Sequence, residues 1–212
     1  MSRRSGAALL GAAAAFAALS ALVAGGVLTR LDQWAIDHAM TDVRVTGAKA
    51  TLAEALVPLL HTDFGSPLDV VTGVVTAPAS LILSFVLVAG CCVAMQHRGR
   101  VRAAYAWAGV WLAGNIVEVL CKSTLTRPAL YSRGLHIVAF DSSFPSGHTV
   151  RSIVVAGVIA TAFPAARRWV AAWACCCIAL LEADAWHTPS DLAGGVLLAA
   201  LLLAAARRLG RS

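Results

Sequence analysis

The chain has 212 residues and a formal net charge of +6, with 59% hydrophobic and 13% charged residues. Because soluble domains carry about 25% charged residues, this composition excludes an ordinary soluble domain and favours a protein embedded in the lipid bilayer. The basic residues form short clusters between long apolar runs, which argues against a nucleic-acid-binding surface. Most of the six cysteines lie within those runs, so they indicate neither a disulfide framework nor a metal site.

Six apolar stretches predict an all-α fold, a six-transmembrane helix bundle that forms a single domain over residues 1–212. Most of them approach the ~20 residues that span a hydrocarbon core as a helix. The first is rich in alanine and follows two arginines, so it is either a cleaved signal peptide or a retained helix, and its length favours a retained helix. The stretches are 7–28, 68–95, 103–121, 149–166, 169–186 and 191–206.

Clusters of arginine flank the predicted spans on one side of the membrane if six helices alternate, and no acidic residue joins them. The positive-inside rule places that side, with both termini, in the cytoplasm. We therefore expect a multi-pass protein of the plasma membrane with an extracytoplasmic active site. The clusters consist of Arg3 and Arg4; Arg98, Arg100 and Arg102; Arg167 and Arg168; and Arg207, Arg208 and Arg211.

A longer segment, residues 29–67, separates the first two stretches. Four apolar residues in it recur at the i, i+3, i+4, i+7 spacing of one helix face. This pattern predicts a short interfacial helix, with Asp32 as a possible N-cap. The four residues are Ile36, Ala39, Met40 and Val43.

The segment Phe144-Pro-Ser-Gly-His148 opens the fourth stretch. Its proline suits the first turn of a helix, and the N–H groups of Ser146 and Gly147 would lie at the positive end of the helix dipole. Such a helix end binds anions. The preceding loop contains Lys122 and Arg127. A phosphoryl group can bind the ammonium of the lysine, which acts as a point charge, and the planar guanidinium of the arginine, which can donate two parallel hydrogen bonds.

A second motif, His187-Thr-Pro-Ser-Asp191, opens the last stretch. Thr188 is a plausible N-cap, and Pro189 would occupy the first helical position. Asp191, on the first turn, could then accept the Nδ1–H of His187 and leave Nε2 free as a nucleophile. His148 remains as a proton donor.

Together the two motifs resemble the type 2 phosphatidic acid phosphatase family, and the resemblance covers the second to the sixth stretch. It implies that His187 is the phosphorylated nucleophile, that Asp191 orients it, and that His148 protonates the leaving oxygen. The core motifs span residues 122–191, and neither a metal nor another cofactor is implied. The resemblance also implies that the phosphoryl group is bound by Lys122, Arg127, Ser146 and the Gly147 amide.

Two family positions carry other residues here: an arginine is replaced by Ala129, and a Ser-Arg pair by Leu180 and Leu181. We therefore expect another cation to replace the missing arginine in neutralising the phosphoryl group. Arg151, one turn beyond the histidine of the first motif, is the first candidate, and Arg133 is the second.

Buried acidic residues offer Arg151 a structural role instead. It could pair with Glu182 or Asp184, since ionisable groups within a span usually face the bundle interior. Glu118, four residues before Lys122, predicts an ion pair that positions the lysine rather than an acid–base catalyst.

The sequence thus predicts a membrane lipid phosphatase whose partners are the membrane and a lipid phosphate, without nucleic acid. Polyprenyl pyrophosphates are the first expected substrates, followed by phosphatidate, phosphatidylglycerol phosphate and prenyl-linked sugar phosphates. A phosphotransferase of the same family and a non-catalytic lipid-phosphate-binding or transport protein are the alternatives.

Overall fold

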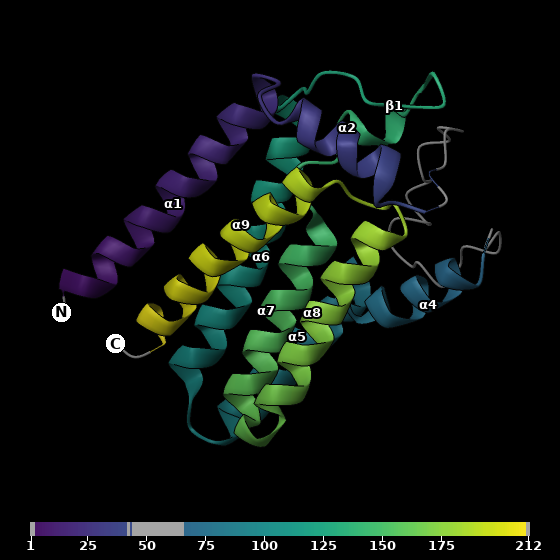
Figure 1. The fold of residues 1–212 in the computed structure, drawn as a ribbon. Coiled ribbons are helices and arrows are strands. Elements are labelled where there is room, and N and C mark those ends of the chain that lie inside the picture. The colour runs from purple at the N-terminus through teal and green to yellow at the C-terminus, as the bar shows by residue number, and fades with distance from the viewer. Residues whose placement is uncertain (1–2, 42, 44–65, 211–212) are drawn as a thin grey trace.

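The computed structural model describes residues 3–41, 43 and 66–210 of the chain. These residues are almost entirely helical, which confirms the all-α class; the strands β1 (Tyr131–Ser132) and β2 (Leu135–His136) form one short antiparallel hairpin. Figure 1 shows the helices in their spatial order. The α-helices are α1 (Arg3–Ala24), α2 (Thr29–His38), α4 (Pro67–Thr76), α5 (Leu81–His97), α6 (Val101–Thr124), α7 (Gly147–Ala162), α8 (Arg167–Ala183) and α9 (Pro189–Leu209).

Several helices are suited to a membrane. Among the described residues, three segments are long and apolar enough to cross it, namely Val101–Thr124, Pro164–Ala183 and Pro189–Leu209. The number rises to five if two bent helix pairs each count as one span, and α7 is apolar but shorter. The structure therefore supports a membrane protein, whereas the predicted number of six spans is not confirmed.

The second apolar stretch, expected as one helix over 68–95, is divided. A 3₁₀ turn, η2 (Ala77–Ala79), follows α4, and the helical segments on either side of Ser80 differ in direction by 41°. Pro78 lies in this turn, and its ring and missing N–H prevent a regular α-helix from continuing through it. The expectation of one uninterrupted helix was wrong.

The first stretch ends in a sharp turn, with α2 at 76° to α1. Gly26 lies in this turn with φ of +73°, a conformation that favours glycine. A Cβ at Gly26 would lie only 2.8 Å from Cγ of Pro128. The glycine therefore also allows a close approach of the loop that carries Arg127.

The short helix expected after the first stretch is present as α2, but it begins and ends earlier than the apolar pattern indicated. Leu28, not Asp32, is its N-cap, and Asp32 lies fully buried in the first turn. Met40 and Val43 follow the helix and still pack against the apolar cluster that contains its buried Ile36. Residues 44–65 of the predicted interfacial segment lie outside the described residues.

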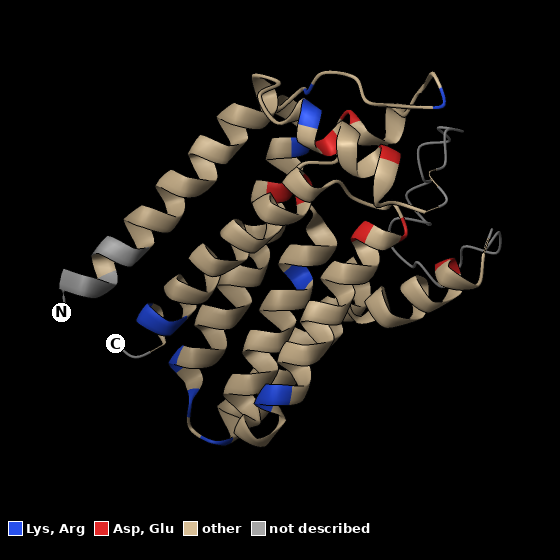
Figure 2. Cartoon of the chain, viewed as in Figure 1, with Lys and Arg blue, Asp and Glu red and all other residues tan. Residues whose placement is uncertain are grey.

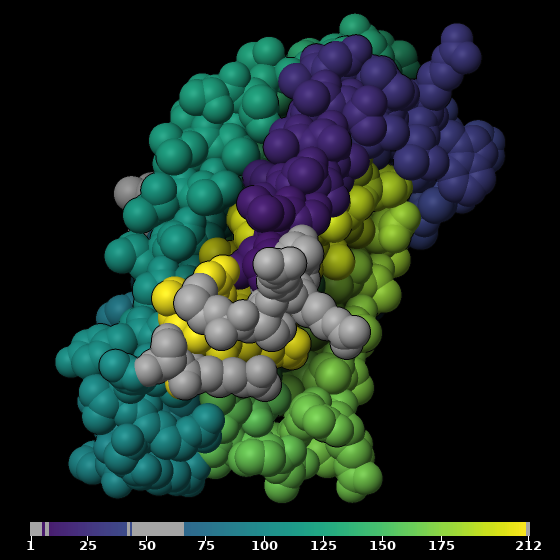
Figure 3. Space-filling model, turned by 90° about the vertical axis from the view of Figure 1, so that its left-hand side faces the viewer, coloured from purple at the N-terminus to yellow at the C-terminus, as the bar shows by residue number. Residues whose placement is uncertain are grey.

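Helix α7 occupies the centre of the bundle, in contact with α5, α6, α8 and α9 (Figure 1). The main apolar core forms between these elements, with Trp107, Val155 and Leu198 among its buried members. Helix α1 lies outside it against α9, and Figure 3 shows α1 covering part of the α9 surface. α7 is thus held from several sides, which fixes the direction of its N-terminus.

The two ends of the bundle differ in charge. Figure 2 shows Asp and Glu together with some Lys and Arg at the end that carries α2 and the start of α9, whereas the opposite end shows Lys and Arg without acidic residues among those described. At the acidic end a second apolar cluster packs α2 against the loop that contains the β-hairpin, with Ile36, Leu130, Ile137 and Phe140 buried. This layer lies over the segments that carry both sequence motifs.

Candidate active site

Helix α9 begins at the N-cap that the sequence predicted, and a capping box forms there. Thr188 is the N-cap and Pro189 the first helical residue. The Asp191 N–H donates to Oγ1 of Thr188 at 3.5 Å, and the Thr188 N–H donates to Oδ2 of Asp191 at 3.1 Å. This reciprocal pair holds the carboxylate back over the helix N-terminus.

The loop before α9 positions His187 through its backbone. The N–H groups of Trp186 and His187 both donate to the carbonyl of Leu181, at 3.0 and 3.2 Å. The ring of His187 is nearly buried, and its Nδ1 lies 3.6 Å from Oδ2 of Asp191, slightly beyond hydrogen-bonding distance. The structure thus brings the two predicted residues together, at a separation common in ligand-free sites whose contacts shorten in the reacting complex.

The carboxylate of Asp191 is fully buried and has further donors. Ser143 Oγ donates to Oδ2 at 2.6 Å, and Nη1 of Arg127 donates to Oδ1 at 3.0 Å. The same Nη1 lies 3.1 Å from Oγ1 of Thr188. Arg127, expected to bind phosphate, therefore already engages the start of α9.

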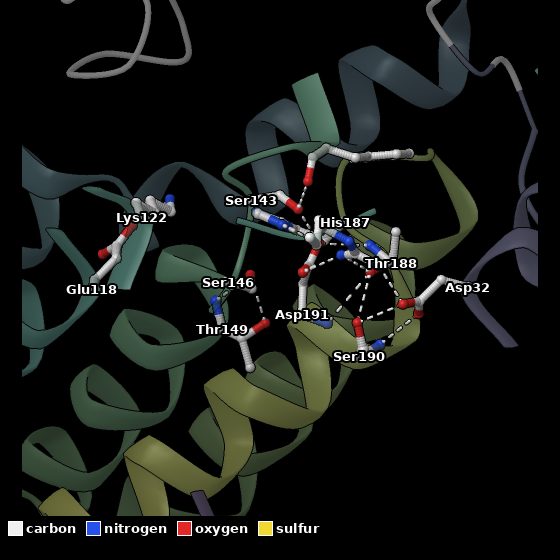
Figure 4. A network of polar contacts seen from close by, with 12 residues as sticks. Asp32, Glu118, Lys122, Ser143, Ser146, Thr149, His187, Thr188, Ser190 and Asp191 are labelled. Atoms are coloured by element: carbon white, nitrogen blue, oxygen red, sulfur yellow. Dashed lines mark hydrogen bonds and ion pairs between the residues drawn. The ribbon is translucent and has the colours of Figure 1, made fainter. Parts of the chain in front are cut away.

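The opposite side of Arg127 meets Asp32 of α2. Its Nη2 donates to Oδ2 of Asp32. This carboxylate also accepts two hydrogen bonds from Ser190, from the backbone N–H at 3.0 Å and from the hydroxyl Oγ at 2.7 Å. Figure 4 shows Asp32, Ser190, Thr188 and Asp191 joined in one network. Sequence reasoning did not assign Asp32, Ser143 or Ser190 to the site.

Helix α7 begins at Gly147, later than the expected placement of Pro145 in its first turn implies. Ser146 is its N-cap and accepts the N–H of Thr149, so Pro145 precedes the helix and the expected placement in its first turn was wrong. The Ser146 N–H donates to the carbonyl of Asp191 at 3.0 Å and is not free for an anion. Among the described residues, the N–H groups of Gly147 and His148 have no hydrogen-bond partner.

Lys122 lies beside this open helix end and forms the ion pair predicted with Glu118, with 2.8 Å between Nζ and Oε1. Figure 4 shows this pair on one side of Ser146 and the network of Asp191 on the other. The Lys122 side chain remains 34% exposed, so its ammonium can take a further partner. Lys122 is therefore accessible to an entering anion.

Arg151 pairs with Glu118, at 2.6 Å between Nη1 and Oε2, rather than with Glu182 or Asp184 as expected. It also donates to Asn115 Oδ1 and to the carbonyl of Ala79. The expected partners were wrong because η2 and α6, not α8, face the guanidinium. The second candidate cation, Arg133, lies exposed in the turn of the β-hairpin, with φ of 51°.

His148 lies on the first turn of α7, and its Nε2 is buried without a hydrogen-bond partner among the described residues. Its ring meets that of Trp186 edge to face, with centroids 5.8 Å apart. Because Trp186 immediately precedes His187, this contact brings the segments of the two histidines together. An unsatisfied imidazole nitrogen at this position is available to a ligand.

The arrangement provides an imidazole held near a buried carboxylate, a second imidazole with an unused nitrogen, and an open helix N-terminus beside a lysine. These are the elements of nucleophilic attack on an anionic centre with proton transfer to a leaving group. No group of three or more His, Cys, Asp or Glu side chains that could hold a metal ion occurs within the described residues.

Comparison with known proteins gives one match. A family model described as the PAP2 superfamily matches residues 102–211, just over half of the chain. The match begins near the start of α6 and includes both histidine motifs. No curated protein and no solved structure matches.

Proposed function

The chain belongs to the PAP2 superfamily, whose members are generally phosphatases, and from this premise we propose that it hydrolyses a lipid-linked phosphate or pyrophosphate through a phosphohistidine intermediate. The observation that supports the proposal is a contact between the N-terminus of α7 and the N-terminus of α9. The Ser146 N–H binds the Asp191 carbonyl, so the open end of α7 is fixed beside the segment of His187.

In the proposed reaction, Nε2 of His187 attacks the terminal phosphorus and displaces the leaving oxygen, which takes a proton from His148. That oxygen belongs to the lipid alcohol in a phosphate substrate and to the lipid monophosphate in a pyrophosphate substrate. Water then gives a proton back to His148 and attacks the phosphohistidine, which releases inorganic phosphate and a neutral His187. Asp191 stabilises the imidazolium form and selects the Nδ1–H tautomer. The first half-reaction breaks one P–O bond and forms one P–N bond, and the second exchanges that P–N bond for a new P–O bond.

For phosphoryl binding we propose Lys122, the N–H of Gly147 and Arg151, which together place positive charge around one end of α7. Ser146 and Arg127 remain predicted ligands. Both already contact α9, through Asp191, so they could touch the substrate only with donors not used in those contacts.

The location of the site favours a lipid substrate. The motifs lie at the end of the bundle where the acidic residues gather, whereas the opposite end shows Lys and Arg without acidic residues in the described part of the chain (Figure 2). By the positive-inside rule we place the site at the extracytoplasmic face of the cell membrane, with both termini in the cytoplasm. A polyprenyl or acyl tail could then stay in the bilayer while its phosphate reaches the histidines.

The orientation of the protein in the membrane can be tested with single cysteines, introduced at Ser132 or at Gln96 in a chain whose six native cysteines are replaced by alanine. A membrane-impermeant thiol reagent added to intact cells should label the first and not the second. The reverse pattern would place the site on the cytoplasmic side.

The activity itself is tested by phosphate release from undecaprenyl pyrophosphate, phosphatidate and phosphatidylglycerol phosphate in detergent, with and without EDTA. We expect release from at least one lipid that persists in EDTA and is lost in His187→Ala. Transfer of phosphate to an added lipid or sugar would instead identify a phosphotransferase. Binding of the lipids without turnover would favour the non-catalytic alternative. This alternative is worth testing because Leu181 occupies a position where the family has an arginine.

A further inference from the structure

Glu118 lies at the place where the proposed phosphoryl group would have to bind. Its side chain is 9% exposed, and its two oxygens are held by Lys122 and Arg151 at 2.8 and 2.6 Å. A Cβ added to Gly147 would lie 1.9 Å from Oε1 and 2.3 Å from Oε2. The carboxylate thus fills the space that any side chain at Gly147 would occupy.

Three sources of positive potential meet at this carboxylate. Two are the cations of Lys122 and Arg151, and the third is the N-terminus of α7, where the N–H groups of Gly147 and His148 have no partner among the described residues. The buried Nε2 of His148 is also without a partner there. An anion site is therefore assembled, and its present occupant is a side chain of the same protein.

We propose that Glu118 is a resident anion of the phosphate site, which the phosphoryl group of the substrate must displace from Lys122 and Gly147. This inference rests on the proposed function. The phosphoryl group of the lipid and the released inorganic phosphate both compete with this carboxylate for the cations, but only the lipid gains further binding free energy from its tail in the bilayer. Glu118 therefore weakens product binding and clears the site for the next lipid.

The positioning role predicted from the sequence has the opposite consequence. If Glu118 only holds Lys122 in place, its removal loosens the lysine and weakens phosphate binding. If Glu118 competes with phosphate, its removal strengthens binding. The sign of the change separates the two roles.

The test is equilibrium binding of inorganic phosphate and orthovanadate to the purified full chain in detergent, which requires no turnover. Glu118→Gln keeps the shape and removes the charge, and we expect it to bind both anions about tenfold more tightly than the wild type. Glu182→Gln is the matched control, because it changes the net charge equally on another helix; its affinity should equal that of the wild type.

Glu118→Asp covers the case in which the glutamine variant does not fold. It keeps the charge beside Arg151, but its shorter side chain withdraws from Gly147, so we expect binding tighter than that of the wild type. Equal or weaker binding in a folded Glu118→Gln, or in Glu118→Asp where the glutamine variant does not fold, overturns the inference. If the wild type hydrolyses lipid phosphate but Glu118→Gln binds phosphate no more tightly, only the inference fails; if the wild type neither hydrolyses a lipid phosphate nor binds either anion, the proposed function fails with it.

Discussion

The two sides of the candidate site differ in how fully their polar groups are used. On the nucleophile side, formed by Asp32, Arg127, Ser143, Thr188, Ser190 and Asp191, each carboxylate oxygen accepts at least one hydrogen bond, and the Nδ1 of His187, 3.6 Å from Asp191, is the buried nitrogen left without one in the described part of the chain. On the phosphate side, formed by Glu118, Lys122, Gly147, His148 and Arg151, two backbone N–H groups and one imidazole nitrogen have no partner among the described residues.

This difference indicates that one side of the site maintains a fixed geometry and the other side binds the ligand. Buried charges that are completely paired keep one geometry, because each displacement would leave a charge without its partner. Buried donors without a partner are costly and gain most from a ligand. The nucleophile side is therefore expected to control stability and the orientation of His187, and the phosphate side to control binding and turnover.

The largest effect is expected on the phosphate side, for His148→Gln. General acid catalysis contributes about 10²–10⁴-fold, so kcat should fall by that factor while the melting temperature stays close to that of the wild type. His136→Gln, an exposed histidine of the hairpin, is the control and should keep full activity. An unchanged kcat in His148→Gln would remove the residue from the mechanism.

Arg127→Met tests the nucleophile side. It leaves Asp32 and Asp191 buried without their shared cation, and breaking a buried pair in this way costs about 3–5 kcal/mol. Thermal unfolding in detergent should show a large drop in melting temperature, only partly restored in Arg127→Lys, which lacks the planar fork. A stable Arg127→Met with weaker phosphate binding would instead support the predicted contact between Arg127 and the substrate.

Ser143→Ala should have a smaller effect. It removes the 2.6 Å hydrogen bond to Asp191, and hydrogen bonds to charged groups contribute about 1.5–3 kcal/mol. We expect a lower melting temperature and a lower kcat with little change in KM, because the Ser143 hydroxyl is engaged with Asp191 and the Phe140 carbonyl. Ser142→Ala, its exposed neighbour, should match the wild type; a rise in KM for Ser143→Ala would indicate direct substrate contact.

The smallest effect is expected for Thr188→Ala, which removes the N-cap of α9. Loss of such a cap costs about 1 kcal/mol, and Thr188→Ser should restore it because a hydroxyl remains. The measurement is the melting temperature of both variants. If the serine variant were as unstable as the alanine variant, the hydroxyl would not be the source of the stabilisation.

The local features of the site could be predicted from the sequence, because they depend on neighbouring residues. The start of α9 follows from the Thr188-Pro189 dipeptide, and the Glu118–Lys122 pair follows from helical spacing. Contacts between distant segments could not be predicted in this way. No local pattern relates Asp32 to Ser190, which lies 158 residues further along the chain.

Helix boundaries show the same limit. The second stretch is apolar throughout, so hydropathy alone could not locate the break, although Pro78 was a signal that one helix would not continue. Arg151 was expected to face α8, since the helix spacing of an apolar segment does not reveal which neighbour a polar residue meets. Its pairing with Glu118 depends on how α6 and α7 pack.

The central claim is that His187 carries the phosphoryl group, and rapid quenching of turnover with a ³²P-labelled lipid phosphate tests it most directly. We predict a protein-bound label that is stable in alkali and lost in acid, as expected for phosphohistidine, and that is absent from His187→Gln. Equal labelling of His187→Gln, or turnover of that variant at the wild-type rate, would contradict the account.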